Sequence, residues 1–442
     1  MKQYLVEHQQ SRCFSNIHFP FLLTPRQSDE NVHPPSNSSS AVRFSLSHKD
    51  YYADCYTSIQ DVPYDWDRLA EGQDLFMGRT YLAALENHPP EPMSFVYLVL
   101  FHHDQAVGLA YGQTYPIQLG ESIRDYSSGS TWEERLKSWI GKTFSFHMLI
   151  FGNALLSGQH HLIFDDHQIK AGHFYELIQE SWDKTAAWLR STGKKVQVMM
   201  VKDLTEAEQQ MTGKLEAAGF HNFPFQPSMS LKLQSGWNSF DDYLDAMSSK
   251  YRVRARRAFK KGKAMQRVEL DTEHLPDYQS VMYDLYQNVA EKADFSLIEL
   301  HPEYIPSLKK TYRDQFTILG YFVGQELVGY CTTLHNGAEL EAHFLGIAPK
   351  ANRKYQLYLN MLYDMIKIGI KLGVERIVFS RTALEIKSSV GATPEVLHCY
   401  LRHRNSLLNL LLPFFVRYLE PEVQWRQRHP FKNVDYSKQE IS

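Results

Sequence analysis

Runs of apolar residues, separated by short polar or glycine-containing turns, divide the first half of the chain into strands and helices. The run SFVYLVLF has the length of a buried strand, and the segment AVGLAYGQTY after the next turn predicts its hairpin partner. Farther on, apolar residues recur at helical spacing, and Gly219 is a usual stop for a helix. The predicted elements are strands over 94–101, 106–115 and 147–156, a helix over 172–190, a strand over 196–201 and a helix over 211–218.

The second half of the chain repeats this order. Two helices precede a hairpin with the turn Gly324-Gln325, and a third strand, a long helix that stops at Gly373 and a further strand follow. The return arms of both hairpins contain a Val-Gly pair, and this repetition predicts two copies of one α/β unit. Its elements are helices over 275–293 and 302–312, strands over 316–323, 326–335 and 339–347, a helix over 354–372 and a strand over 375–381.

The predicted fold class is α/β (α+β), with two tandem units, each a mixed, mostly antiparallel sheet with helices on both faces. Residues 1–45 are expected to be a flexible leader, because the stretch QSDENVHPPSNSSS is polar and rich in turn residues. The first unit is then assigned to residues 46–235 and the second to residues 236–442.

The composition excludes several classes of protein. Apolar residues make up 43% of the 442 residues and charged residues 22%, as in ordinary globular proteins. Lys and Arg number 47 against 50 Asp and Glu, a net charge of −3, so any basic surface for a polyanion must be local. The four cysteines lack CxxC spacing, which argues against a metal site and disulfides and favours a cytoplasmic location. No apolar window has the length of a membrane-spanning helix.

Three segments between Met247 and Asn405 carry a resemblance to a known family. They read SSKYRVRARRAFKKG, HFLGIAPKANRKYQLYLNMLYDMI and FSRTALEIKSSVGATPEVLHCYLRHRN. Together with the repeated unit, they resemble bacterial FemAB-like (Fem-type) N-acyltransferases, which carry two GNAT units in tandem. The resemblance covers about three quarters of the chain and is stronger in the second unit. It implies that the acyl donor lies between two splayed strands, with its phosphates at the start of the next helix.

The resemblance places the donor beside the end of strand 339–347 and the loop after it. Acetyl-CoA-binding members usually have Gln or Arg, two residues and then Gly-x-Gly or Gly-x-Ala in this loop, whereas residues 348–355 read APKANRKY. We expect side chains to replace part of the glycine cradle, and strand amides to stabilise the oxyanion. No tightly bound cofactor is expected, and the co-substrate is acyl-CoA or an acyl-carrier protein. The donor-binding candidates are Leu345, Gly346, Lys350, Arg353, Lys354 and Tyr355.

Glu341 and His343 are the candidates for general-base catalysis. They are two residues apart on a predicted strand, so both side chains lie on one face, where they would take a proton from an attacking amine. The alternative is an exposed edge strand with solvated charges. Tyr400 is a third catalytic candidate, which would protonate the departing thiolate.

Charged residues follow the strand 375–381, where the end of a strand opens on a ligand crevice in α/β folds. Arg381 would hold an anionic group of the substrate or donor, and Glu385 and Lys387 complete this group of substrate-binding candidates. Surface ion pairing is the alternative interpretation.

Eight cations and no acid occur between Met247 and Lys263, in a segment with Ser248 or Ser249 as cap and Gly262 as end of a helix. The segment is either a solvated basic face or a docking surface for a polyanion. The polyanions considered are a carrier protein, coenzyme A, tRNA and an anionic membrane. The docking candidates are Arg252, Arg256, Arg257, Lys260 and Lys261.

The segment 407–416 (LLNLLLPFFV), with nearby cations and Trp425, has the composition of an interfacial anchor. The alternative is a helix that closes the second core.

These features predict a cytoplasmic N-acyltransferase, at the inner face of the membrane if the acceptor is a lipid. It would transfer an acyl group, most simply a fatty acyl group, from a thioester to an amine, with a lipid amine as one acceptor. The first alternative is an aminoacyl-tRNA-dependent peptidyltransferase of cell-wall precursor synthesis. The second is a GNAT-fold binding protein without catalysis, because a fold alone does not establish activity.

Overall fold

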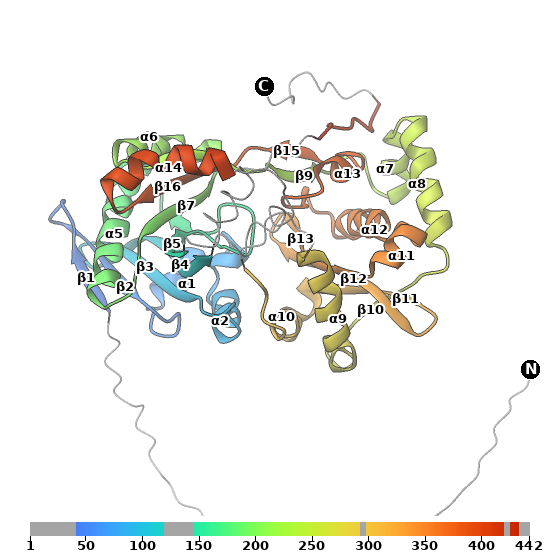
Figure 1. Cartoon of the computed structure of the whole chain (residues 1–442), viewed down its shortest axis with the longest axis horizontal. Helices are drawn as coiled ribbons and strands as arrows, with labels where there is room; N and C mark the ends of the chain where they lie inside the picture. Colours follow the sequence, from blue (N-terminus) through green and yellow to red (C-terminus); the bar gives the residue numbers. More distant parts are fainter. Residues whose placement is uncertain (1–40, 119–144, 292–297, 420–424, 433–442) are drawn as a thin grey trace, which may run out of the picture. The chain divides into compact units, whose positions relative to one another are not determined.

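The computed structural model describes residues 41–118, 145–291, 298–419 and 425–432. Within them, two large sheets are flanked by helices, as the sequence predicts for an α/β fold (Figure 1). Both sheets are mostly antiparallel, and each contains one parallel pair of strands, β5–β7 in the first and β13–β14 in the second. The predicted fold class is therefore confirmed.

The first sheet has the strand order β1-β2-β3-β4-β5-β7-β16-β8, and β6 pairs with β4. The first strand of its long central hairpin, β3, is apolar almost without interruption. Helices cover both faces of the sheet, so nearly every side chain of β3 is buried. The strands are β1 (Val42–Ser45), β2 (Tyr51–Tyr56), β3 (Ser94–His102), β4 (Gln105–Gln118), β5 (Ser145–Phe151), β6 (Leu162–Phe164), β7 (Val198–Leu204), β8 (His221–Pro224) and β16 (His398–His403).

The second sheet has the strand order β10-β11-β12-β13-β14-β9-β15. From β2 in the first sheet and β10 in the second, the strands of the two sheets are arranged in the same way. An antiparallel hairpin is followed by a third antiparallel strand, then by a strand parallel to it, and then by two further antiparallel strands. The strands are β9 (Ser228–Lys232), β10 (Gln266–Glu269), β11 (Phe316–Val323), β12 (Glu326–Asn336), β13 (Glu339–Ile347), β14 (Arg376–Val378) and β15 (Thr393–Glu395).

The two sheets exchange one strand each. β9 precedes the predicted junction at 235/236 but pairs with β14 and β15 in the second sheet. β16 comes near the end of the chain but pairs with β7 and β8 in the first sheet. The assigned ranges 46–235 and 236–442 thus separate most strands of the two sheets, although β9 and β16 cross over. β1, within the predicted leader 1–45, pairs with β2.

Three apolar cores lie against the sheets. One packs α5 and α6 on the first sheet, and another packs α7, α8 and α12 on the second. The third contains α1, α2, α9 and α10 and side chains of both sheets, so it joins the two halves of the chain. The helices of these cores are α1 (Asp65–Ala70), α2 (Arg79–Asn87), α5 (Ala171–Ser191), α6 (Gln209–Ala217), α7 (Phe240–Ala246), α8 (Ser249–Gly262), α9 (Leu275–Ala290), α10 (Tyr304–Tyr312) and α12 (Leu357–Leu372).

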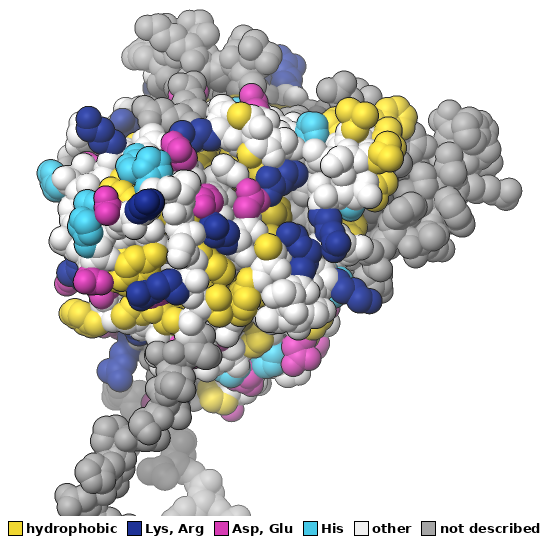
Figure 2. All heavy atoms as spheres, turned by 90° about the vertical axis from the view of Figure 1, so that its left-hand side faces the viewer, with side chains coloured by type: hydrophobic (Ala, Val, Ile, Leu, Met, Phe, Trp, Pro, Cys, Tyr) yellow, Lys and Arg dark blue, Asp and Glu magenta, His cyan; other side chains and the backbone are white. Residues whose placement is uncertain are grey.

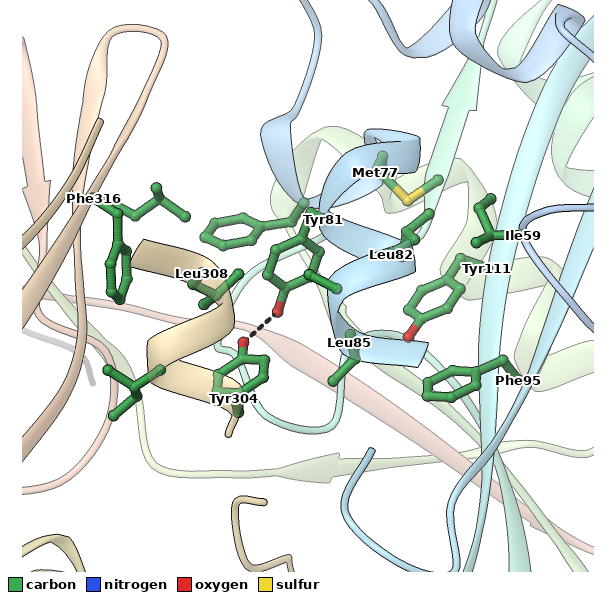
Figure 3. Close-up of a cluster of buried hydrophobic side chains, with 14 of the residues drawn as sticks. Ile59, Met77, Tyr81, Leu82, Leu85, Phe95, Tyr111, Tyr304, Leu308 and Phe316 are labelled. Carbon is green, nitrogen blue, oxygen red and sulfur yellow. Dashed lines mark hydrogen bonds between the residues drawn. The ribbon is translucent and has the colours of Figure 1, made fainter. Parts of the chain in front are cut away.

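Figure 3 shows the shared core where α2 meets α10. The hydroxyl groups of Tyr81 on α2 and Tyr304 on α10 are 2.8 Å apart and hydrogen-bonded. Both rings are fully buried, and each hydroxyl would cost free energy without a partner. This pair therefore ties the two halves together by a polar contact inside an apolar core.

Candidate active site

Strand β13 is paired with the parallel strand β14 only over its first three residues. Glu339, Leu340 and Glu341 pair with residues 376–378 of β14, and β13 then runs on to Ile347. Arg376 forms ion pairs with Glu339 and Glu395 at the closed end of this opening. The predicted donor site therefore lies along a strand edge that β14 leaves uncovered among the described residues.

Backbone alternation decides which amides face this opening. Phe344 uses its N–H and its carbonyl group to bond the Thr332 hydroxyl on β12, and the Ala348 N–H donates to the Val328 carbonyl on the same strand. Alternate residues of a strand direct their backbone groups to opposite sides. The Leu345 amide thus faces the opening, whereas the Gly346 amide faces β12.

Gly346 has a packing role. A Cβ atom built on it would lie 2.4 Å from the Tyr330 ring and 2.7 Å from the Leu285 side chain on α9. We expect Gly346→Ala to destabilise the protein by about 1–3 kcal/mol, because the added methyl group overpacks this contact. Urea unfolding of the variant would measure the loss, and an unchanged free energy of unfolding would show that α9 can move away.

Glu341 and His343 lie on the face of β13 that points toward the shared core. Glu341 is only 6% exposed, and burial raises the pKa of its carboxyl group to about 8. Burial lowers the pKa of His343 to about 3, so its ring is neutral at physiological pH. The expected common face is present, and it is an enclosed face rather than a solvated one.

A chain of hydrogen bonds leads from His343 into the first half. His343 Nε2 is 3.1 Å from the Tyr304 hydroxyl, which bonds Tyr81, and Asn153 Nδ2 donates to the Tyr81 hydroxyl over 3.2 Å. The other ring nitrogen, His343 Nδ1, is buried without a hydrogen-bond partner in the described structure. Buried nitrogen atoms without a partner are uncommon in folded proteins, so this atom makes His343 a candidate site residue.

His160 and Asp74 also approach this site, and the sequence gave no reason to single them out. His160 Nδ1 is 2.8 Å from Asp74 Oδ2, and Asn336 Nδ2 of β12 donates to Asp74 Oδ1 over 3.0 Å. Burial alone would lower the pKa of His160, but the Asp74 carboxylate outweighs it and raises the pKa to about 9. The only local sequence signal is the polar His160-His161 pair before a strand.

The loop predicted to hold the donor phosphates is largely helical. Residues Pro349–Tyr355 form the short helix α11, and Gln356 then adopts a left-handed conformation before α12 begins. Counting from Arg353, Gln356 and Tyr358 occupy the two positions that are glycine or alanine in the acetyl-CoA pattern. Lys350, Arg353 and Lys354 are exposed, whereas Tyr355 is partly buried against the second core.

The three substrate-binding candidates have different surroundings. Arg381 forms a bidentate ion pair with the buried Asp203 of β7, so an acid of the first half already neutralises it. Glu385, on α13 (Leu384–Ser388), pairs with Arg428. Lys387 is 4% exposed and donates to the carbonyl groups of residues 380 and 381, and burial lowers its pKa to about 7.

Tyr400 does not join Glu341 and His343 in the structure. It lies on β16, the strand that crosses to the first sheet, and its ring is buried in the core formed with α5 and α6. A role for Tyr400 in protonating the thiolate therefore has no support from its position.

The predicted basic helix is α8, which begins after Ser248 and ends with Gly262. Ala255, Ala258 and Gly262 face the second core, where the Asn360 side chain of α12 donates to the Ala258 carbonyl group. Arg252 forms an ion pair with Asp245. Four of the docking candidates are exposed and form no ion pair with a described acid: Arg256, Arg257, Lys260 and Lys261.

The apolar C-terminal segment forms α14 (Ser406–Leu419), which packs on β16 and β8 of the first sheet rather than on the second core. Its Asn409 side chain faces inward and donates to the Gly219 carbonyl group. Leu407, Leu410 and Phe414 face outward, with exposed fractions of 72%, 74% and 69%. Hydrophobic side chains accordingly gather over α14 at the upper right of Figure 2.

The described residues contain no cluster of three or more His, Cys, Asp or Glu side chains that would suit a metal ion. None of the described helices meets the length and hydropathy needed to cross a membrane.

A comparison with known protein families finds a match within the second half of the chain. Residues 249–388 match the family described as acetyltransferase (GNAT) domain. The predicted resemblance to GNAT proteins is therefore confirmed by sequence for residues 249–388, and the first sheet has the same strand arrangement as the second. This GNAT domain supports an acyltransferase. None of the curated proteins matches the chain.

Solved structures with similar folds have low sequence identity to this chain. FemX has a TM-score of 0.49 and 11% identity, covering 81% of this chain and 98% of FemX. A tandem GNAT protein from the clavulanic acid biosynthesis pathway has a TM-score of 0.44 and 10% identity, covering 74% and 88%. The C-terminal domain of a lysylphosphatidylglycerol synthetase from Agrobacterium fabrum has a TM-score of 0.39 and 11% identity, covering 67% and 95%.

Proposed function

We propose that the protein is an N-acyltransferase that transfers a fatty acyl group from a thioester to an amine, with Glu341 as general base. The observation that carries this proposal is the buried Glu341 carboxyl group, beside the opening between β13 and β14, with a pKa raised to about 8. A base of this pKa is matched to removing a proton from an amine near neutral pH.

In this mechanism the neutral amine attacks the thioester carbonyl carbon. The C–N bond forms, the C–S bond breaks, the amine proton passes to Glu341 and the thiol departs as thiolate. The Leu345 amide faces the opening and would donate to the oxyanion. His343 is neutral and is hydrogen-bonded to Tyr304 through Nε2, so its Nδ1 would form a hydrogen bond with the substrate.

Two features bear on the identity of the acyl donor. Gln356 and Tyr358 replace the small residues of the acetyl-CoA loop, which favours a donor other than acetyl-CoA. A pocket between α9 and α10 has a mainly apolar lining but a volume of only about 10 Å³, so an alkyl chain could enter it only if its walls moved apart. Its lining includes Met282, Tyr286, Leu300, Ile305 and Tyr330.

The exposed apolar face of α14 supports an acceptor at a membrane surface, such as a lipid amine. Leucine and phenylalanine on an exposed helix face are suited to the boundary between head groups and acyl chains. This feature would place a cytoplasmic enzyme at the inner face of the membrane. The exposed cations of α8 favour the second candidate, an aminoacyl-tRNA-dependent transferase.

The deciding experiment is product mass spectrometry. The purified chain would be incubated with acyl-CoA, acyl-carrier protein or aminoacyl-tRNA, each with lipid amines, small amines and cell-wall precursors. We expect an acylated amine from one of the two thioester donors. Amino acids added to a precursor would establish the second candidate instead, and no product from any pairing would overturn both.

The exposed cations of α11 give a separate prediction for the donor. Replacing Arg353 and Lys354 together with Gln should raise the KM for the thioester donor by about tenfold, because two charges near the donor phosphates are lost. The KM for the amine should change less. Equal donor KM values in variant and parent would remove these two side chains from the donor site.

A further inference from the structure

His160 lies in the first half of the chain, yet its ring is held at the site of the second half. Its Nδ1 atom is 2.8 Å from Asp74 Oδ2, and its Nε2 atom is 3.3 Å from the Ser157 carbonyl oxygen. The Phe76 ring packs on it with 4.7 Å between centroids. Gly158 allows this position, because a Cβ atom there would lie 2.6 Å from His160 Nε2. The ring therefore has little freedom to move.

Asp74 and Asn336 fix this ring relative to the catalytic strand. Asn336 on β12 donates to Asp74, and its own side-chain oxygen accepts from the Leu75 N–H over 3.0 Å. Asn336 is paired with Glu339 on β13, and Glu341 lies two residues farther on. The imidazole of the first half is thus tied by hydrogen bonds to β12, the neighbour of the strand that carries Glu341.

The charges around Glu341 show what His160 contributes. The positive charges of His160 and Arg376 lower the pKa of Glu341 and so favour its carboxylate form. The negative charges of Glu339 and Asp74 raise that pKa. Arg376 is already engaged by two other carboxylates, those of Glu339 and Glu395. Around His160 itself, Asp74 and Glu341 favour the charged ring and Lys202 opposes it. Lys202 forms an ion pair with Asp203.

We propose that His160 is a positioning residue for acyl transfer: held by Asp74, it is the cation of the first half that keeps the buried Glu341 carboxylate available as a base. The active centre is then built from both halves of the chain. The inference rests on the proposed function in giving Glu341 the role of base, and the coupling between the two groups can be measured without turnover.

The kinetic test compares His160→Gln with His161→Gln. His161 is the adjacent residue, fully buried, and burial lowers its pKa to about 3, so its replacement removes no charge at neutral pH. Loss of the His160 cation should move the rising limb of the pH–rate profile toward higher pH by about one pH unit. His161→Gln should leave the midpoint of that limb in place. Equal midpoints for parent and His160→Gln would overturn the proposal.

A reciprocal measurement covers the case in which His160→Gln does not fold. By linkage, Glu341→Gln must lower the titration midpoint of His160 by as much as the His160 cation lowers that of Glu341. NMR titration of histidine-labelled parent and Glu341→Gln protein measures this without substrate. A His160 midpoint that does not move would overturn the proposal, whereas a shifted midpoint in a protein without acyl transfer would overturn the proposed function alone.

Discussion

Replacing Glu341 with Gln is expected to lower turnover by about two to four decades, the usual loss when a positioned general base is removed. The fold should survive, because the amide has the same shape and a neutral group is cheaper to bury than a carboxylate. Steady-state turnover with the donor and amine found by product analysis measures the effect. A folded variant with parental turnover would remove Glu341 from the mechanism.

Glu339→Gln is the matched control for this change. Glu339 lies on the same strand, carries the same charge and is neutralised by Arg376 at the closed end of the opening. Its replacement should change turnover by less than about tenfold. A loss as large as that of Glu341→Gln would mean that the net charge of the strand matters and that neither carboxylate is a specific base.

The pH dependence of the parent follows from the same carboxyl group. The pKa of Glu341 is raised to about 8, so the base is protonated at lower pH and turnover should rise until the pH exceeds about 8. The stability of the folded protein changes with pH in the opposite direction to turnover. Between the ordinary pKa of Glu and about 8, the folded state binds the extra proton, so this group makes the protein less stable as pH rises.

Hydrophobic periodicity was sufficient to predict the repeated α/β unit, because each hairpin and long helix has a local pattern of its own. It could not predict the strand exchange. β9 and β16 are five and six residues long, too short for their own apolar pattern to specify a sheet. Which sheet receives each strand depends on pairings far along the chain. The displacement of Tyr400 follows from this, since the exchange places it in the first sheet.

The candidate site was predictable where it depends on a single strand. The two-residue spacing of Glu341 and His343 was enough to place both on one face of β13. The first-half residues around that face, Asp74, Tyr81 and His160, lie more than 170 residues earlier. No local pattern marks them. For the same reason the sequence predicted that Arg381 binds an anionic group of the substrate or donor. In the structure its guanidinium group is already paired with the carboxylate of Asp203, 178 residues away.

Charge reversal on α8 should produce the other large effect, in binding rather than in catalysis. Changing Arg256, Arg257, Lys260 and Lys261 to Glu alters exposed positions only, so the fold should be retained. If α8 docks an acyl-carrier protein beside the donor opening, the association rate should fall about ten- to a hundredfold. Stopped-flow binding of acyl-carrier protein at two salt concentrations would measure this.

The control is an equal reversal at scattered cations. Lys49, Lys195, Lys310 and Lys371 are exposed, and their change to Glu gives the same net charge as the α8 variant. If both variants lose affinity equally, the effect belongs to net charge and α8 has no docking role. Loss confined to the α8 variant would assign docking to this helix, since total charge is matched and only the location differs.

The class of ligand then follows from how binding depends on salt. For tRNA, the slope of log affinity against log salt should approach the number of phosphates neutralised, and the α8 variant should lose several units of that slope. A carrier protein should show a gentler dependence, concentrated in the association rate. Coenzyme A contacts few cations, so the α8 variant should bind it as the parent does. Anionic vesicles should still bind through α14, whose exposed leucines are unchanged. If the α8 variant binds acyl-carrier protein, tRNA and vesicles like the parent, the cations of α8 are a solvated face without a partner.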